Sequence, residues 1–168
     1  RNGGFFLYGN DSEQLFARPK EAYDGATPSA NSAAANNLIR LSRLTGLHDL
    51  EEKAQQIIRL FSGSLENYPT GFSHLLNAAI MLETGGTEVI IAGEADKGAD
   101  KLLNMIRQGF RPFAVSMYYN RSFEDLKNLV PFITEYSPLD EKAAAYVCRD
   151  FTCNAPVTDA ENLRQMLQ

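Results

Sequence analysis

The sequence lacks tryptophan and holds only two cysteines and two histidines among its 168 residues. It also lacks a lysine- and arginine-rich block, and its formal net charge is −5, which argues against nucleic acid or an anionic membrane as a partner. No apolar run approaches the roughly 20 residues that span a bilayer. Two cysteines are too few for a disulfide-dense secreted scaffold, and we therefore expect a cytoplasmic protein. The start does not resemble a signal peptide, and a chain that opens on Arg1 is expected to be a fragment of a longer protein.

Nucleotide and nucleophile motifs are also missing. Neither the G-x-G-x-x-G fingerprint nor the G-x-x-x-x-G-K-[ST] loop occurs, and there is no G-x-S-x-G elbow. The turn at 92–98 follows a predicted strand, but it carries Glu94 and Asp96 where a pyrophosphate would lie. We therefore expect no cofactor, and no second Cys/His pair completes a metal site.

The first half of the chain reads as a β-hairpin followed by three helices. Phe5 to Phe16 form two apolar, aromatic runs around the turn-forming triplet 9–11. Amphipathic spacing predicts helices over 32–45, 49–65 and from Pro69 to the Gly85–Gly86 pair, the first capped by Asn31 or Ser32. Short connections predict that these helices pack as antiparallel neighbours.

The second half changes to a strand and helix alternation. Strands are predicted at 88–92, 113–118 and 144–148, helices at 101–107 and 123–130, and a last helix opens at the capping box 158–161. This order favours a small three-stranded parallel sheet. The fold class is therefore mixed α+β and α/β, with one part over 1–86 and a small α/β part over 87–168.

A polar segment precedes the first helix. Glu21 and Asp24 enclose Tyr23, and two such carboxylates could serve as an acid/base pair in a sugar-type site. Ser29 and Asn31 follow and could bind substrate or cap the helix. From local chemistry both interpretations stay open, and the capping loop is favoured.

His74, Cys148 and Cys153 complete the candidate residues. His74 shares the start of the third helix with hydroxyl-bearing residues, although a lone histidine is more often structural than catalytic. His48 is expected at the surface of a helix–helix turn. Cys148 and Cys153 form a C-x4-C pair, which could be a disulfide or two buried thiols.

Four separated strings resemble a known family. They are RPKEAYDGATPSANSAAANNLIRL, YPTGFSHLL, EVIIAGE and AYVCRDFTCNAPVTDAENL, and together they resemble the C-terminal part of the thioredoxin-domain-containing, spermatogenesis-associated protein 20-like (YyaL-like) proteins. The resemblance covers essentially the whole chain in order.

This resemblance implies an architecture more than a reaction. The chain would supply the last helical hairpins of an α/α toroid, similar to six-hairpin glycosidases and sugar epimerases, plus a closing α/β segment. Its partners would be the missing N-terminal toroid and thioredoxin-like domain of the same chain, and a sugar ligand. Asp24 would face the toroid cavity, with His74 and Glu21 as further catalytic candidates and Tyr23, Ser29 and Asn31 as binding residues.

Two functional hypotheses follow. The first is a fragment of a carbohydrate-binding or carbohydrate-active protein, catalytically incomplete when isolated. The second is a non-enzymatic scaffold or thiol-linked interaction module. A toroid fragment would also have lost partners for its apolar helix faces, so we expect self-association or an exposed hydrophobic patch.

Overall fold

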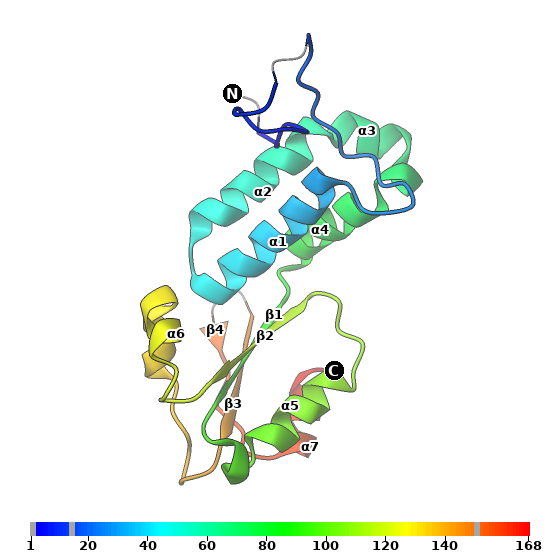
Figure 1. Ribbon diagram of the computed structural model, residues 1–168. Coiled ribbons are helices and arrows are strands. Elements are labelled where there is room, and N and C mark those ends of the chain that lie inside the picture. The colour runs from blue at the N-terminus through cyan, green and yellow to red at the C-terminus, as the bar shows by residue number, and fades with distance from the viewer. Residues whose placement is uncertain (1–2, 14–15, 150–151) are drawn as a thin grey trace. The chain divides into compact units, whose positions relative to one another are not determined.

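The computed structural model of the protein describes residues 3–13, 16–149 and 152–168 (Figure 1). Within these residues there are seven α-helices and one four-stranded mixed sheet. The chain divides into two compact units, one over 1–42 and 46–84 and the other over 43–45 and 85–168. The fold is therefore mixed α/β.

The first unit is built mainly from helices. Its helices are α1 (Ala30–Thr45), α2 (His48–Leu60), α3 (Ser62–Asn67), the 3-10 helix η1 (Pro69–Phe72) and α4 (Ser73–Thr84). Gly46 ends α1 with a left-handed backbone, φ 72°, as its lack of a Cβ allows. The helix predicted over 49–65 is two helices, because Phe61 leaves the helical conformation with φ −106° and ψ 11°.

The predicted N-terminal β-hairpin is wrong, since residues 3–13 and 16–29 contain no strand within the described chain. Leu15 lies outside the described residues. The backbone N–H of Leu7 donates to the carbonyl of Pro19 over 3.0 Å, but Pro19 has no N–H to return the second bond of an antiparallel pair. The Arg18 guanidinium instead donates to the carbonyl of Tyr8 over 3.0 Å, so a side chain replaces the missing ladder.

The second unit is organised around a sheet of order β2-β1-β3-β4. The strands are β1 (Thr87–Ala92), β2 (Ala114–Tyr119), β3 (Ala144–Arg149) and β4 (Thr152–Cys153). β1 and β2 are parallel, as predicted, whereas β3 runs antiparallel to β1 and β4 antiparallel to β3. The predicted all-parallel sheet is therefore wrong: β3 starts at Ala144, opposite the last residue of β1, Ala92. The chain leaves β2 at Tyr119 and enters β3 at Ala144, and both residues lie beside Ala92 at the same end of the sheet, so β3 must run antiparallel to β1 and β2.

Helices cover both faces of this sheet (Figure 1). Val89 and Ile91 of β1 pack in a core with α5 (Ala99–Arg107) and α7 (Ala160–Met166). Ile90 and Ala92 face the other way, toward α6 (Glu124–Leu129) and the 3-10 helix η3 (Pro131–Glu135). Because β1 is buried on both faces, it reads as a continuous apolar run rather than an alternating one.

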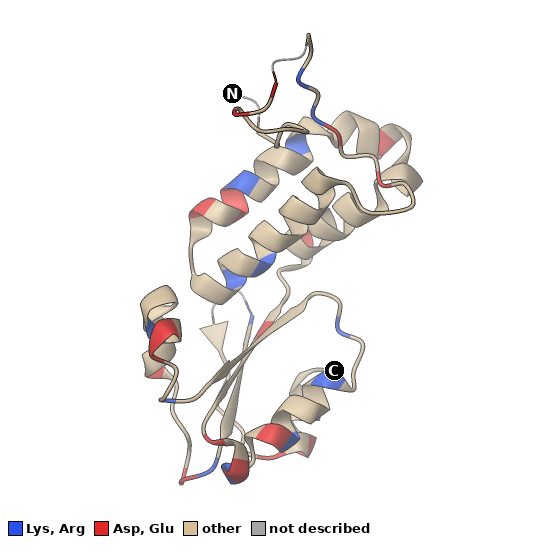
Figure 2. Ribbon diagram, in the orientation of Figure 1, with Lys and Arg blue, Asp and Glu red and all other residues tan. Residues whose placement is uncertain are grey.

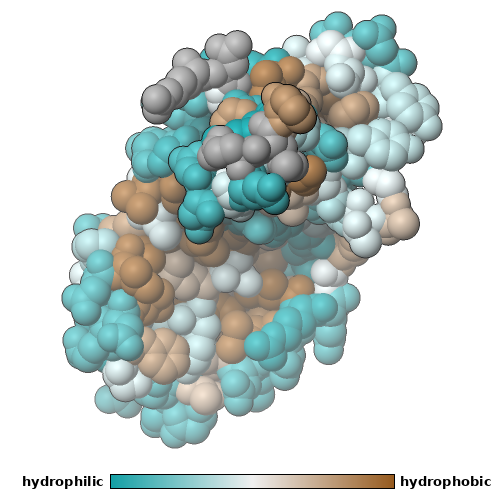
Figure 3. Space-filling model, turned by 45° about the horizontal axis from the view of Figure 1, so that its top comes forward, coloured by the Kyte–Doolittle hydropathy of each residue, from teal (hydrophilic) through white to brown (hydrophobic). Residues whose placement is uncertain are grey.

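Charged and apolar groups are both present at the surface. Lysine and arginine are interspersed with aspartate and glutamate in both units (Figure 2). Apolar side chains also reach the surface (Figure 3). Phe110 has the second-highest exposure of the described large apolar side chains, at 93%. Across the described residues, no helix combines the length and apolar character needed to cross a membrane.

Candidate functional site

The carboxylate of Asp24 ties its loop to the starts of two helices. Its Oδ1 accepts the backbone N–H of Ser29 over 2.8 Å. Its Oδ2 accepts the backbone N–H groups of His74 and Leu75, over 2.8 and 3.2 Å. These are donors in the first turn of α4, where a negative charge is favoured by the helix dipole. The structure therefore brings Asp24, Ser29 and the backbone of His74 together, fifty residues apart in sequence.

Ser29, rather than Asn31 or Ser32, caps α1. Its Oγ accepts the backbone N–H of Ser32 over 3.1 Å. The Ser32 hydroxyl in turn donates to the carbonyl of Ala22 over 3.2 Å. Of the three candidate caps, Ser29 is therefore the one used, because the side chain of Ser32 instead holds the loop against the helix.

Asn31 holds the N-terminal segment and is 2% exposed. Its Oδ1 accepts from the backbone N–H of Phe5 over 2.7 Å, and its Nδ2 donates to the Phe5 carbonyl over 2.9 Å. The same Nδ2 donates to the carbonyl of Glu21 over 2.8 Å. The side-chain amide of Asn31 thus bonds both backbone groups of Phe5, as a neighbouring β-strand would. In this structure Asn31 therefore binds the main chain.

Glu21 and the ring of His74 contribute less to this network. Glu21 is exposed, and among the described residues its carboxylate has no hydrogen bond. His74 is half-buried, and its carbonyl accepts from Nδ2 of Asn36 over 2.8 Å. Within the described chain its imidazole makes no hydrogen bond, so the contact of His74 with Asp24 runs through its backbone.

Tyr23, Tyr68 and Phe72 form an aromatic platform around Gly71. Tyr23 is 58% and Tyr68 is 54% exposed. A Cβ added at Gly71 would lie 2.5 Å from Cε1 of Tyr68 and 2.9 Å from Cε2 of Tyr23, so both rings rest on this glycine and a larger residue would displace them. The Tyr23 ring meets Phe72 edge-to-face at 6.1 Å, and the N–H of Asp24 donates to the Gly71 carbonyl over 2.7 Å. Sequence reasoning missed Tyr68 as a surface partner of Tyr23, because nothing in either string pairs the two loops.

A cavity of about 660 Å³ adjoins the N-terminal segment. Its walls include Phe5, Phe6, Lys20 and Lys53. The Lys20 ammonium donates to the carbonyl of Gly3, and that of Lys53 pairs with Asp49 over 2.9 Å. Both charges are therefore engaged within the protein.

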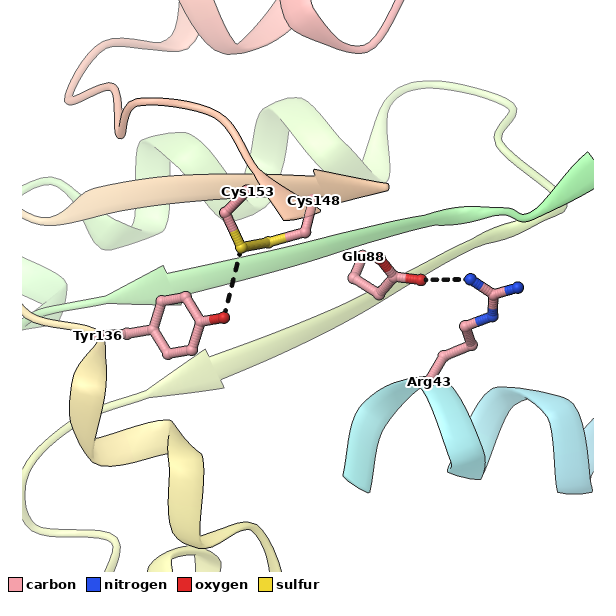
Figure 4. The surroundings of a disulfide bond; sticks show 5 residues. All are labelled: Arg43, Glu88, Tyr136, Cys148 and Cys153. Atoms are coloured by element: carbon pink, nitrogen blue, oxygen red, sulfur yellow. Dashed lines mark hydrogen bonds and ion pairs between the residues drawn. A yellow bond between two sulfur atoms is a disulfide. The ribbon is translucent and has the colours of Figure 1, made fainter. Parts of the chain in front are cut away.

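Cys148 and Cys153 are joined by a disulfide across two strands (Figure 4). They are direct partners in the ladder between β3 and β4. Cys148 is 2% exposed, whereas Cys153 is exposed. The hydroxyl of Tyr136 lies 3.5 Å from Sγ of Cys153, and it is the donor because a disulfide sulfur carries no hydrogen. Burial raises the pKa of Tyr136 above its ordinary value of 10.0, so this donor keeps its proton at neutral pH.

A buried ion pair lies beside the disulfide, at the neighbouring strand β1 (Figure 4). Glu88 of β1 stands opposite Cys148 of β3. Its Oε1 accepts from the Arg43 guanidinium over 3.0 Å, and both side chains are about 5–6% exposed. Such a pair stabilises a fold only while both charges are present.

In the described part of the chain, no geometry supports a metal or phosphate site. No group of three or more metal-ligating side chains occurs within the part of the chain that the structure describes. In the turn after β1, Glu94 accepts from Nδ2 of Asn120 over 2.6 Å. A Cβ at Gly93 would lie 2.7 Å from the Cα of Ala143, so this glycine serves close backbone packing.

Comparison with known proteins identifies relatives in animals. No protein-family model matches this sequence. Human spermatogenesis-associated protein 20 is 30% identical over 174 residues, which cover 99% of this chain and 22% of the human protein. The rat protein of the same name is 29% identical, over 98% of this chain and 21% of its own length. An uncharacterized protein of Caenorhabditis elegans is 29% identical, over 97% of this chain and 22% of its own.

These alignments run through both compact units rather than through one of them. The chain spans about a fifth of the length of the curated relatives it matches. It is therefore homologous to one part of spermatogenesis-associated protein 20.

Proposed function

We propose that the aromatic platform (Tyr23, Tyr68 and Phe72) binds carbohydrate, as part of a longer carbohydrate-binding or carbohydrate-active protein. The observation that carries this proposal is the pair of tyrosine rings, each more than half exposed, resting on one glycine. Tyrosine offers an apolar ring face and a hydroxyl, which suits a ligand with C–H surfaces and many hydroxyl groups. Large exposed aromatic groups that gather in one place are typical of a binding surface.

Rigidity supports the same proposal. The loop of Tyr23 is fixed by the carboxylate of Asp24, and the loop of Tyr68 by the packing around Gly71. A surface that is already ordered loses less conformational entropy when a ligand binds. The acid/base roles of Asp24, Glu21 and His74 stay a prediction. In this structure the Asp24 carboxylate accepts three backbone N–H groups, which is a structural role.

We also infer that α1, α2 and α4 are helices of an α/α toroid in the longer protein, as the family resemblance implies. Leu76 and Ile80 of α4 are each 37% exposed, one turn apart on one face. The relatives are several times longer than this chain, so further segments of the same protein are available to cover that face. They would include the rest of the toroid and the thioredoxin-like domain. The isolated chain should then self-associate in light scattering.

Saccharide titration by NMR tests the carbohydrate proposal. The probes are glucose, N-acetylglucosamine, cellohexaose and maltohexaose, added to the chain and to its Tyr23→Ala and Tyr68→Ala variants. We expect saturable shifts with at least one probe and a loss of affinity of about five- to tenfold in each variant, since an aromatic contact contributes about 1 kcal/mol.

Phe110→Ala is the matched control, because Phe110 is an exposed aromatic residue of the second unit. Its affinity should equal that of the unmodified chain. Folded protein that binds none of these saccharides, or that binds them equally well in the tyrosine variants, contradicts the proposal and favours the scaffold hypothesis.

A further inference from the structure

We propose that Cys153 is a thiol-exchange site, at which a small monothiol opens the Cys148–Cys153 disulfide and becomes bound in a mixed disulfide. The two sulfurs differ sharply in access: Cys148 is 2% exposed, and Cys153 is exposed on the short strand β4. A thiolate attacks whichever sulfur it can approach. The geometry therefore directs attack to Sγ of Cys153 and makes Cys148 the leaving group.

The exchange balances without any cofactor. The thiolate of the monothiol forms a bond to Sγ of Cys153, the Cys148–Cys153 bond breaks, and its electron pair passes to Sγ of Cys148, which takes a proton from water. Attack by Cys148 on the mixed disulfide reverses the step and releases the monothiol. A second monothiol can instead attack the mixed disulfide, which leaves both cysteines reduced and one small disulfide as the oxidised product.

Tyr136 is a positioning residue for this site. Its hydroxyl donates to Sγ of Cys153 over 3.5 Å, and its ring is held edge-to-face against Tyr146 at 4.8 Å. The Tyr146 hydroxyl donates to the carbonyl of Ser137 over 2.8 Å, which fixes the segment after η3. In the fully reduced protein the same hydroxyl would stabilise the thiolate of Cys153, so the exposed cysteine is the nucleophile that attacks a small disulfide and restores the mixed disulfide.

The chemical class of the partner follows from the surroundings. The two cysteines are only five positions apart in the sequence, and β4 pairs with β3 at just two positions among the described residues, Cys148↔Cys153 and Arg149↔Thr152. A small thiol can reach an exposed sulfur at such an edge without further docking. The cytoplasm, where we expect this protein, maintains abundant thiols of this kind.

Peptide mapping of the unmodified chain tests which sulfur is attacked. The chain is incubated with glutathione, quenched in acid, treated with N-ethylmaleimide and digested with trypsin. Cleavage after Lys142, Arg149 and Arg164 places Cys148 in the peptide 143–149 and Cys153 in the peptide 150–164. We expect glutathione on 150–164 and N-ethylmaleimide on 143–149. Glutathione on 143–149, or no opening of the disulfide in folded protein, overturns the proposal.

The preference for Cys153 over Cys148 can also be measured as a reaction rate, in two single-cysteine variants. In Cys148→Ser the remaining thiol is the exposed one, and in Cys153→Ser it is the buried one. With glutathione disulfide, we expect the thiol of Cys148→Ser to react at least about tenfold faster while folded, and the two to react equally in urea. Equal rates in the folded variants would contradict the proposal.

Tyr136→Phe separates positioning from a merely structural role. In the Cys148→Ser background it should slow the reaction with glutathione disulfide by about two- to threefold, because a higher thiol pKa lowers the thiolate fraction while partly raising its nucleophilicity. The rate in urea should not change. A rate unaltered in the folded protein would show that the Tyr136 hydroxyl does not act on Cys153.

Discussion

Replacing Asp24 by alanine should destabilise the first unit, because three backbone donors lose their acceptor. The affected N–H groups belong to Ser29, His74 and Leu75. Loss of a helix cap costs about 0.5–2 kcal/mol, and a hydrogen bond to a charged group contributes about 1.5–3 kcal/mol. Asp24 is half-buried, so water replaces part of the lost bonding. We expect a decrease of about 2–4 kcal/mol in the free energy of unfolding.

Urea denaturation followed by circular dichroism measures that decrease, and amide hydrogen exchange locates it. Exchange at His74 and Leu75 should accelerate in Asp24→Ala, whereas amides of the sheet should keep their rates. Glu21→Ala is the matched control: its carboxylate is exposed, and its free energy of unfolding should stay within about 0.5 kcal/mol of the original. Equal stabilities of the two variants would refute the view that Asp24 joins the two helix starts.

Two further predictions concern the second unit. Glu88→Gln should lower the free energy of unfolding by about 3–5 kcal/mol, because it removes the negative charge opposite buried Arg43. The double variant Glu88→Leu, Arg43→Met should recover most of that loss in thermal unfolding; a double variant as unstable as the single one would contradict the ion-pair argument. Asp159 caps α7, and the backbone N–H of Asn162 lowers the pKa of its carboxyl below the ordinary 3.8. The unfolded chain then binds the proton more readily, so this contribution is complete above pH 3.8 and is lost as pH falls through the lower folded value. Asp159→Asn should therefore flatten the acid side of the stability curve measured by urea denaturation from pH 5 downward.

Local signals predicted the helices well and the sheet only in part. Amphipathic spacing together with Gly46 placed the end of α1 at Thr45, where the structure has it. The hairpin failed because the aromatic run beginning at Phe5 has strand propensity, while Pro19 cannot complete the pairing. The direction of β3 depends on where the chain re-enters the sheet, which is a non-local property. No pattern within 144–148 encodes it.

The polar segment illustrates the same division. Sequence reasoning identified Asp24 as a candidate catalytic residue and Ser29 as a candidate cap of the first helix or binding residue, but it did not predict that Asp24 caps α4. Asp24 serves α4, which starts about fifty residues away, and Ser29 serves α1. Tyr68 and Tyr23 likewise both approach Gly71, where the missing Cβ leaves room for their rings. Contacts of this kind depend on folding of the whole unit and leave no trace in local spacing.

The capping role and the proposed binding role of this segment reinforce each other. A carboxylate that accepts three backbone N–H groups is poorly suited to transfer protons, but it fixes the backbone from which Tyr23 projects. The backbone bond from Asp24 to Gly71 then sets the distance between the loops of Tyr23 and Tyr68. For the proposed carbohydrate surface, Asp24 would therefore position the binding residues and take no part in a reaction. Asp24→Asn, which keeps one acceptor oxygen, should therefore weaken saccharide binding and loosen the His74 amide together, because both depend on the same loop.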